Sequence, residues 1–93
     1  MVNAVVLIKA RTEAVSELAE ALVSLPGVTE VFSVAGHYDL VALLRVGQNE
    51  DLADLVSGGI RKLAGVQTTE TLIAFRVYSR AELEAGFDLG MDN

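Results

Sequence analysis

The segment from Gly36 to Asp39 (Gly-His-Tyr-Asp) concentrates side chains that could take part in recognition chemistry. Gly36 can adopt backbone conformations that other residues disfavour, which predicts a turn. Asp39 comes directly before an apolar run, where its carboxylate either stabilises that turn or pairs with a cation such as an amino group. Tyr38 either stacks on a ligand or packs across the chain. We therefore treat this turn, His37 included, as a candidate binding site.

Two threonines further along the chain form a second candidate. Thr69 and Thr71 are separated by one residue, so on a strand their side chains would lie on the same face. Hydroxyl groups placed in this way could hold a carboxylate. Threonine is also an ordinary strand residue whose presence requires no ligand, and both interpretations stay open.

Catalysis and metal binding are disfavoured by the residue types themselves. The chain has no cysteine and a single histidine, His37, so we expect neither a transition-metal site nor a thiolate nucleophile. A serine nucleophile would need His37 as its base. The glycine pair that follows Ser57 lies inside an expected helix and lacks the preceding strand of a phosphate-binding loop. We predict a non-enzymatic protein with no catalytic residues, no metal and no cofactor.

Six elements must position these residues, and the first half of the chain holds three of them. Asn3–Ala10 is short, apolar and β-branched, which predicts a strand. The apolar spacing over 13–25 predicts a helix that Thr12 caps and that Pro26 ends. Val28–Ala35 is a second expected strand.

The second half repeats the pattern of strand, helix and strand. The turn leads into Leu40–Val46, which should form a hairpin with the strand before it. A helix that Asn49 caps and Gly65 ends comes next, and Val66–Tyr78 is the last expected strand. Beyond it, Ser79 and Glu82 fit a capping box for a short helix that Gly86 would end. Phe87 and Leu89 would then dock on the body or on a neighbour.

This order predicts an α+β, ferredoxin-like βαββαβ fold with an antiparallel sheet. Right-handed crossovers place both helices on one face. Only Asp39 and Arg45 are charged between 39 and 46, so the other face also carries apolar side chains that favour burial. We expect two subunits to dimerise through these faces into an α/β sandwich or barrel, with coverage by the C-terminal tail as the alternative. The expected domain spans 1–93, with 79–93 a short C-terminal helix and tail.

The formal charge of −6, from 13 acidic and 7 scattered basic residues, disfavours direct contact with nucleic acid or with anionic membranes. No apolar run approaches the ~20 residues that a spanning helix needs. The first residues show no basic region before their apolar run and no cleavage signal after it. We therefore expect a cytoplasmic protein.

Two segments resemble the effector-binding, or RAM, domain of the Lrp/AsnC family. "LPGVTEVFSVAGHYDLVALLRV" is similar to that family's Pro-Gly-Val, strand, Ala-Gly and x-Tyr-Asp-aliphatic pattern. "LAGVQTTETLIAF" is similar to its Gly-Val-x-x-Thr-x-Thr segment. Together the resemblance extends from Val5 to about Val77.

The resemblance implies dimers that pack through their sheets, join into octamer-like rings and bind an amino acid between neighbouring dimers. Asp39 would then pair with the α-ammonium group, while backbone amides and hydroxyls take the carboxylate. His37 would influence the choice of ligand. The residues implied to bind the ligand are Gly36, His37, Tyr38, Asp39, Thr69 and Thr71.

The sequence also departs from the family pattern, because family regulators carry a helix-turn-helix domain ahead of this one. Here only a few residues precede the first expected strand. We therefore expect a stand-alone amino-acid-sensing module that could modulate a full-length Lrp/AsnC regulator by mixed assembly. A cofactor-free oxygenase-like enzyme of the dimeric α+β barrel type and an ACT-like metabolic sensor are the alternatives. The apolar run Val41–Leu44 disfavours the enzyme, because such barrels usually place polar catalytic groups near the sheet centre.

Overall fold

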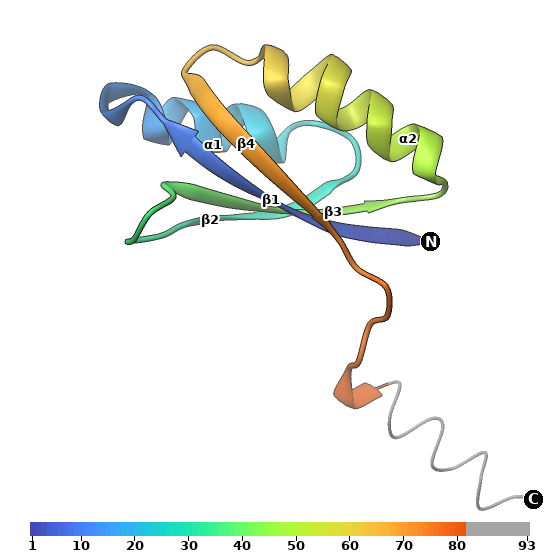
Figure 1. Cartoon of the computed structure of the whole chain (residues 1–93). Coiled ribbons are helices and arrows are strands. Elements are labelled where there is room, and N and C mark those ends of the chain that lie inside the picture. Colours follow the sequence, from blue (N-terminus) through green and yellow to red (C-terminus); the bar gives the residue numbers. More distant parts are fainter. Residues whose placement is uncertain (82–93) are drawn as a thin grey trace, which may run out of the picture.

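The computed structural model describes residues 1–81, which form a four-stranded sheet and two helical segments. Figure 1 shows how these elements are arranged. A short 3₁₀ turn, Thr12–Ala14, precedes α1, while α2 continues as a π-helical segment, Asp54–Gly59, and a 3₁₀ turn, Ile60–Lys62. The strands and helices, in chain order, are β1 (Val2–Ala10), α1 (Val15–Val23), β2 (Val28–Ser33), β3 (Leu40–Val46), α2 (Asn49–Ala53) and β4 (Val66–Ile73).

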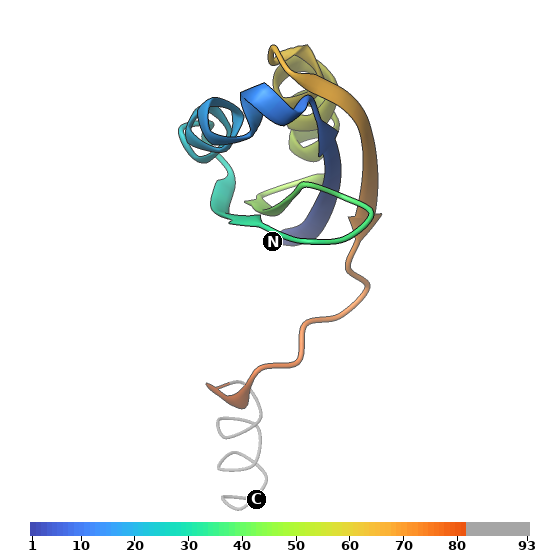
Figure 2. The same cartoon turned by 90° about the vertical axis from the view of Figure 1, so that its left-hand side faces the viewer.

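The strands pair in the order β2-β3-β1-β4, and all neighbours are antiparallel. The view in Figure 2 shows both helical segments on the same side of the sheet. This arrangement confirms the predicted ferredoxin-like α+β fold with two helices on one face. The prediction of a single domain over 1–93 extends beyond the described residues and stays a prediction.

The core lies between the sheet and the helices, because alternate residues of each strand share a face. In β1, Val6 and Ile8 have no exposed surface, and the helical side contributes equally buried side chains. Each such aliphatic side chain stabilises the fold by about 1.5–3 kcal/mol. The largest fully buried side chains are Ile8, Leu18, Leu22, Leu40, Ile60 and Val6.

The last strand is shorter than the sequence predicts, since β4 ends at Ile73 rather than Tyr78. Ala74 still donates its N–H to the carbonyl of Asn3, at 2.9 Å. Beyond that point β1 has almost no residues left to pair with, and a strand cannot continue in a sheet without a partner. The second strand likewise ends at Ser33, before the expected Ala35.

The predicted helix caps were wrong. Thr12 lies within the 3₁₀ turn and makes no capping hydrogen bond. Asn49 is the first residue of α2, so Gln48 occupies the cap position and its N–H donates to Asp51 Oδ2 at 3.2 Å. The backbone of Arg80 is helical; Glu82, Gly86, Phe87 and Leu89 lie outside the described residues.

Candidate functional site

The loop between β2 and β3 is held to the end of β1 by its own backbone and by Asp39. The Asp39 N–H donates to the Ile8 carbonyl at 2.9 Å, and the Ala10 N–H donates to Asp39 Oδ2 at 2.9 Å. Ala10 lies where the pairing of β1 with β4 shifts register. Gly36 has a φ of 147°, a conformation that glycine adopts without strain. One carboxylate oxygen of Asp39 thus stabilises the turn.

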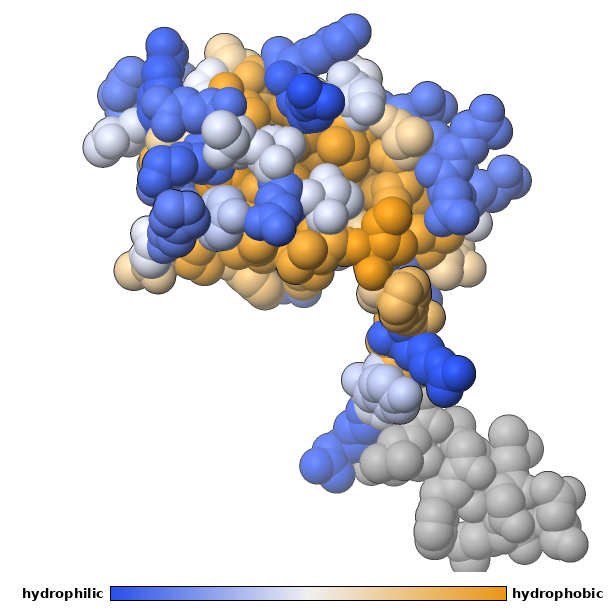
Figure 3. Space-filling model, viewed as in Figure 1, coloured by the Kyte–Doolittle hydropathy of each residue, from blue (hydrophilic) through white to orange (hydrophobic). Residues whose placement is uncertain are grey.

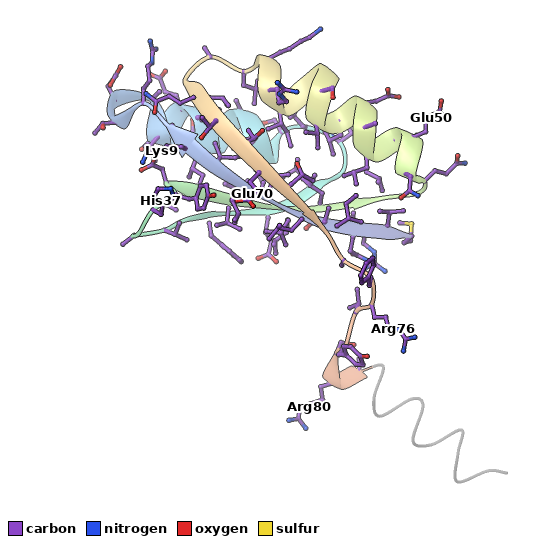
Figure 4. All side chains as sticks on the ribbon, viewed as in Figure 1. Lys9, His37, Glu50, Glu70, Arg76 and Arg80 are labelled. Carbon is purple, nitrogen blue, oxygen red and sulfur yellow. The ribbon has the colours of Figure 1, made fainter. Side chains whose placement is uncertain are left out.

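Tyr38 ties the same loop to β4. Its hydroxyl donates to Glu70 Oε2 at 2.5 Å, and this hydrogen bond, followed by loss of hydration and the carboxylate charge, raises the pKa of Tyr38 above its usual 10.0. The His37 ring stands edge-on to Tyr38, with centroids 5.0 Å apart. Lys9 Nζ donates to the His37 carbonyl at 3.3 Å. Figure 4 shows Lys9 and His37 close together at the end of the sheet where this loop lies.

The two threonines lie on the opposite face of the sheet from this loop. Thr69 pairs with Ile8 and Thr71 pairs with Val6, and residues paired across strands share a face. Glu70 pairs with Leu7 instead, so the Tyr38 hydroxyl reaches the face that the helices leave open. The six predicted site residues therefore form two groups, one on each face of β4.

A groove of about 580 Å³ runs beside β4 on its helix side. The threonines contribute hydroxyl groups to it, and the helical segment after α2 contributes Val56 and Arg61. Sequence reasoning missed Arg61 because the local pattern does not show which side of β4 the end of the helical segment faces. The sequence signal that could have indicated Arg61 was its position in the last helical turn, shortly before the Gly-Val that leads into β4. The lining residues are Val56, Arg61, Val66, Gln67, Thr68, Thr69 and Thr71.

The open face of the sheet is apolar at its centre. Val5 and Leu7 of β1 and Val41 and Leu43 of β3 lie there half-buried. Toward the edges, Phe32 is 45% exposed and Leu72 is 48% exposed. In Figure 3 apolar residues line the lower side of the body, where this face lies.

The chain after β4 leads away from the body as an extended segment (Figure 1). Phe75 is 103% exposed and Tyr78 is 86% exposed. Residues 74–81 therefore do not cover the open face of their own subunit.

Two further properties concern residues 1–81 alone. No helix within them is long and apolar enough to cross a membrane. No three acidic or histidine side chains among them lie close enough together to hold a metal ion.

Comparison with known proteins identifies the family. The family model described as the Lrp/AsnC ligand binding domain matches residues 3–83. The HTH-type transcriptional regulator FL11 from Pyrococcus furiosus is 33% identical over 75 residues, which cover 81% of this chain and 49% of that protein. The chain spans less than half the length of the curated relatives that it matches.

Solved structures share this fold. The crystal structure of TTHA0845 from Thermus thermophilus matches with a TM-score of 0.81 and 54% identity, covering 86% of this chain and all of that one. The transcriptional regulator NMB0573 from Neisseria meningitidis, described as a complex with L-Met, has a TM-score of 0.76 over 85% of this chain and 53% of that one. At 16% identity the second match shows the fold alone.

Proposed function

Because the chain belongs to the Lrp/AsnC ligand binding domain family, we propose that it is an amino-acid-sensing module that acts through assembly. The observation that carries the proposal is the exposed strand β4, which has the Gly36–Asp39 turn on one face and Thr69 and Thr71 on the other. Asp39 accepts one backbone hydrogen bond, and an ionised carboxylate has lone pairs for further donors. It can therefore also receive an α-ammonium group.

One subunit does not bring both groups of residues to the same face. We therefore place the ligand between neighbouring dimers, where the turn of one subunit meets the threonines of a subunit in the next dimer. The Neisseria regulator with its L-Met ligand supports an amino acid as the small molecule.

Self-association in two steps, first into dimers and then into rings of dimers, supplies that neighbour. The open face has an apolar centre, and a second copy of the same face would remove it from water. The exposed aromatic side chains of Phe75 and Tyr78 lie on a segment that extends away from its own subunit, within reach of such a partner. Dimers formed in this way would join into octamer-like rings.

The effect on transcription would pass through a DNA-binding regulator of the same family, since this chain carries a net charge of −6 and offers little to phosphate groups. The curated relatives are named as transcriptional regulators, so the same proposal places the domain in the cytoplasm. No specific observation favours the oxygenase-like alternative.

Calorimetry against the twenty amino acids, combined with sedimentation, tests the proposal. We expect at least one amino acid to bind and the chain to sediment as a dimer or larger species. Asp39→Asn keeps an oxygen that can accept the Ala10 N–H but removes the charge, so it should weaken amino-acid binding while assembly stays intact. Asp39→Ala removes both and should also destabilise the turn. A monomer that binds none of the twenty would contradict the proposal.

A further inference from the structure

The groove beside β4 combines neutral polar groups, an apolar wall and one positive charge. Its volume of about 580 Å³ is within the range of small-molecule pockets. Gln67 and the threonines supply an amide and hydroxyl groups, whereas Val56 and Val66 supply aliphatic surface. Arg61 is the one ionisable residue among those that line it.

Arg61 is a free cation in a strongly acidic chain. Within residues 1–81 Arg61 makes no ion pair, whereas Arg11 forms a salt bridge with Glu13. A guanidinium group presents its N–H donors in a planar fork that matches a carboxylate through two parallel hydrogen bonds. Such a group in a groove that hydroxyls also line is suited to an anionic part of a ligand.

Both sides of the groove are fixed by the core. Thr69 and Thr71 lie opposite Ile8 and Val6, which have no exposed surface. Ile60, immediately before Arg61, is also fully buried and holds the 3₁₀ turn in place. A π-helical segment directly precedes this turn, and π-helical segments are frequent at functional sites.

We propose that Arg61 is the carboxylate anchor of this groove and the residue that makes binding depend on a free carboxylate. The proposal rests on the proposed function, because it names which part of the amino acid the groove receives. The carboxylate would lie between Arg61 and the hydroxyls of Thr69 and Thr71, with an aliphatic side chain toward Val56 and Val66.

The test uses calorimetry on the full chain with three probe panels: the twenty amino acids, their primary amides and their 2-hydroxy acids. The amides should not bind measurably, because they lack the charged carboxylate. Arg61→Gln should weaken binding of the acids on the order of tenfold to a hundredfold, as loss of a charged hydrogen-bonded pair does. The affinity of Arg61→Lys should lie between those of the original chain and Arg61→Gln, since lysine keeps the charge without the planar fork.

Lys62→Gln is the matched control, because it removes the same charge from the next residue, which does not line the groove. It should change the affinity by less than about twofold, as expected for an exposed charge outside a contact. Sedimentation of each variant shows whether assembly is intact.

The outcomes separate this inference from the proposed function. If amino acids bind and Arg61→Gln behaves like Lys62→Gln, the anchor is wrong and the sensing function stands. If only the 2-hydroxy acids bind, in an Arg61-dependent way, the anchor stands and the sensing of amino acids fails. Three outcomes would overturn the carboxylate anchor. The amides could bind as well as the acids, or neither acid panel could bind. Inorganic phosphate could also bind more tightly than the acids in an Arg61-dependent way.

Discussion

The two faces of the sheet come from alternating residues of the same strands, but residues 1–81 of one subunit cover only one of them. In β1, Val6 and Ile8 are fully buried beneath the helices, whereas Val5 and Leu7 on the other face are half-buried. All four side chains are apolar, so residue type does not explain the difference. The position of the helices explains the difference, because both pack on the same side of the sheet (Figure 2). The centre of the open face thus has the composition of a core, and residues 1–81 provide no second layer over it.

The largest expected effect comes from the covered face. Leu22→Ala in α1 removes a side chain with no exposed surface and leaves a cavity that the packed core fills only in part, which should cost about 3–5 kcal/mol of unfolding free energy. Leu72→Ala on the open face, where the side chain is 48% exposed, should cost less than half as much. Urea unfolding at a protein concentration at which sedimentation shows separate subunits measures both variants, and equal losses would contradict the distinction between the faces.

The next effect concerns assembly. Phe32→Lys places a charge on the open face, where it should weaken self-association by about 2–3 kcal/mol, or roughly a hundredfold, because the charge would be buried without a partner. Val23→Lys is the matched control, since Val23 is 49% exposed on α1 and Phe32 is 45% exposed on β2. Sedimentation over a concentration series should show a smaller species for Phe32→Lys alone. If both variants assemble like the original chain, the open face is not the contact surface.

The smallest effect concerns the hydrogen bond between Tyr38 and Glu70, which connects the loop to β4 near the open face. This bond raises the pKa of Tyr38, so its contribution to stability is present below the unfolded-state value near 10 and is lost as pH rises through the higher folded-state value. In a Tyr78→Phe background, Tyr38 is the remaining tyrosine. Its phenolate absorbance should then appear above pH 10, and Glu70→Gln should move that midpoint downward. If Glu70→Gln leaves the titration midpoint of Tyr38 unchanged, the hydrogen bond does not form in solution.

Much of the fold could be predicted from local patterns, and the errors have physical causes. Leu40–Val46 was predicted with the bounds that the structure shows, because its apolar run is bounded by a turn and by Gly47. Val66–Tyr78 was predicted too long because strand propensity continues past Ile73 while the pairing partner does not. The caps were misassigned because Thr12 and Asn49 have suitable side chains but lie one residue inside their helical segments.

The candidate site was predicted only in part. The sequence proposed the Gly36–Asp39 turn and the threonine pair as binding residues, since these residue types occur together in few patterns. It could not show that Tyr38 reaches Glu70 while Thr69 and Thr71 point the other way, because that depends on the pairing of β4 with β1. Arg61 lines the groove because the helical segment that follows α2 passes beside β4. The sequence did not predict this position.

The sequence by itself determined the order of the elements, the apolar character of both strand faces and the acidic charge. Each follows from properties that neighbouring residues carry locally: backbone preference, hydrophobic period and ionisation. Only the tertiary structure decided which apolar face is covered, which side of β4 each polar group occupies and which cation lines the groove with the threonines. Those outcomes depend on strand register and helix packing, which bring distant residues together through contacts that no local pattern specifies.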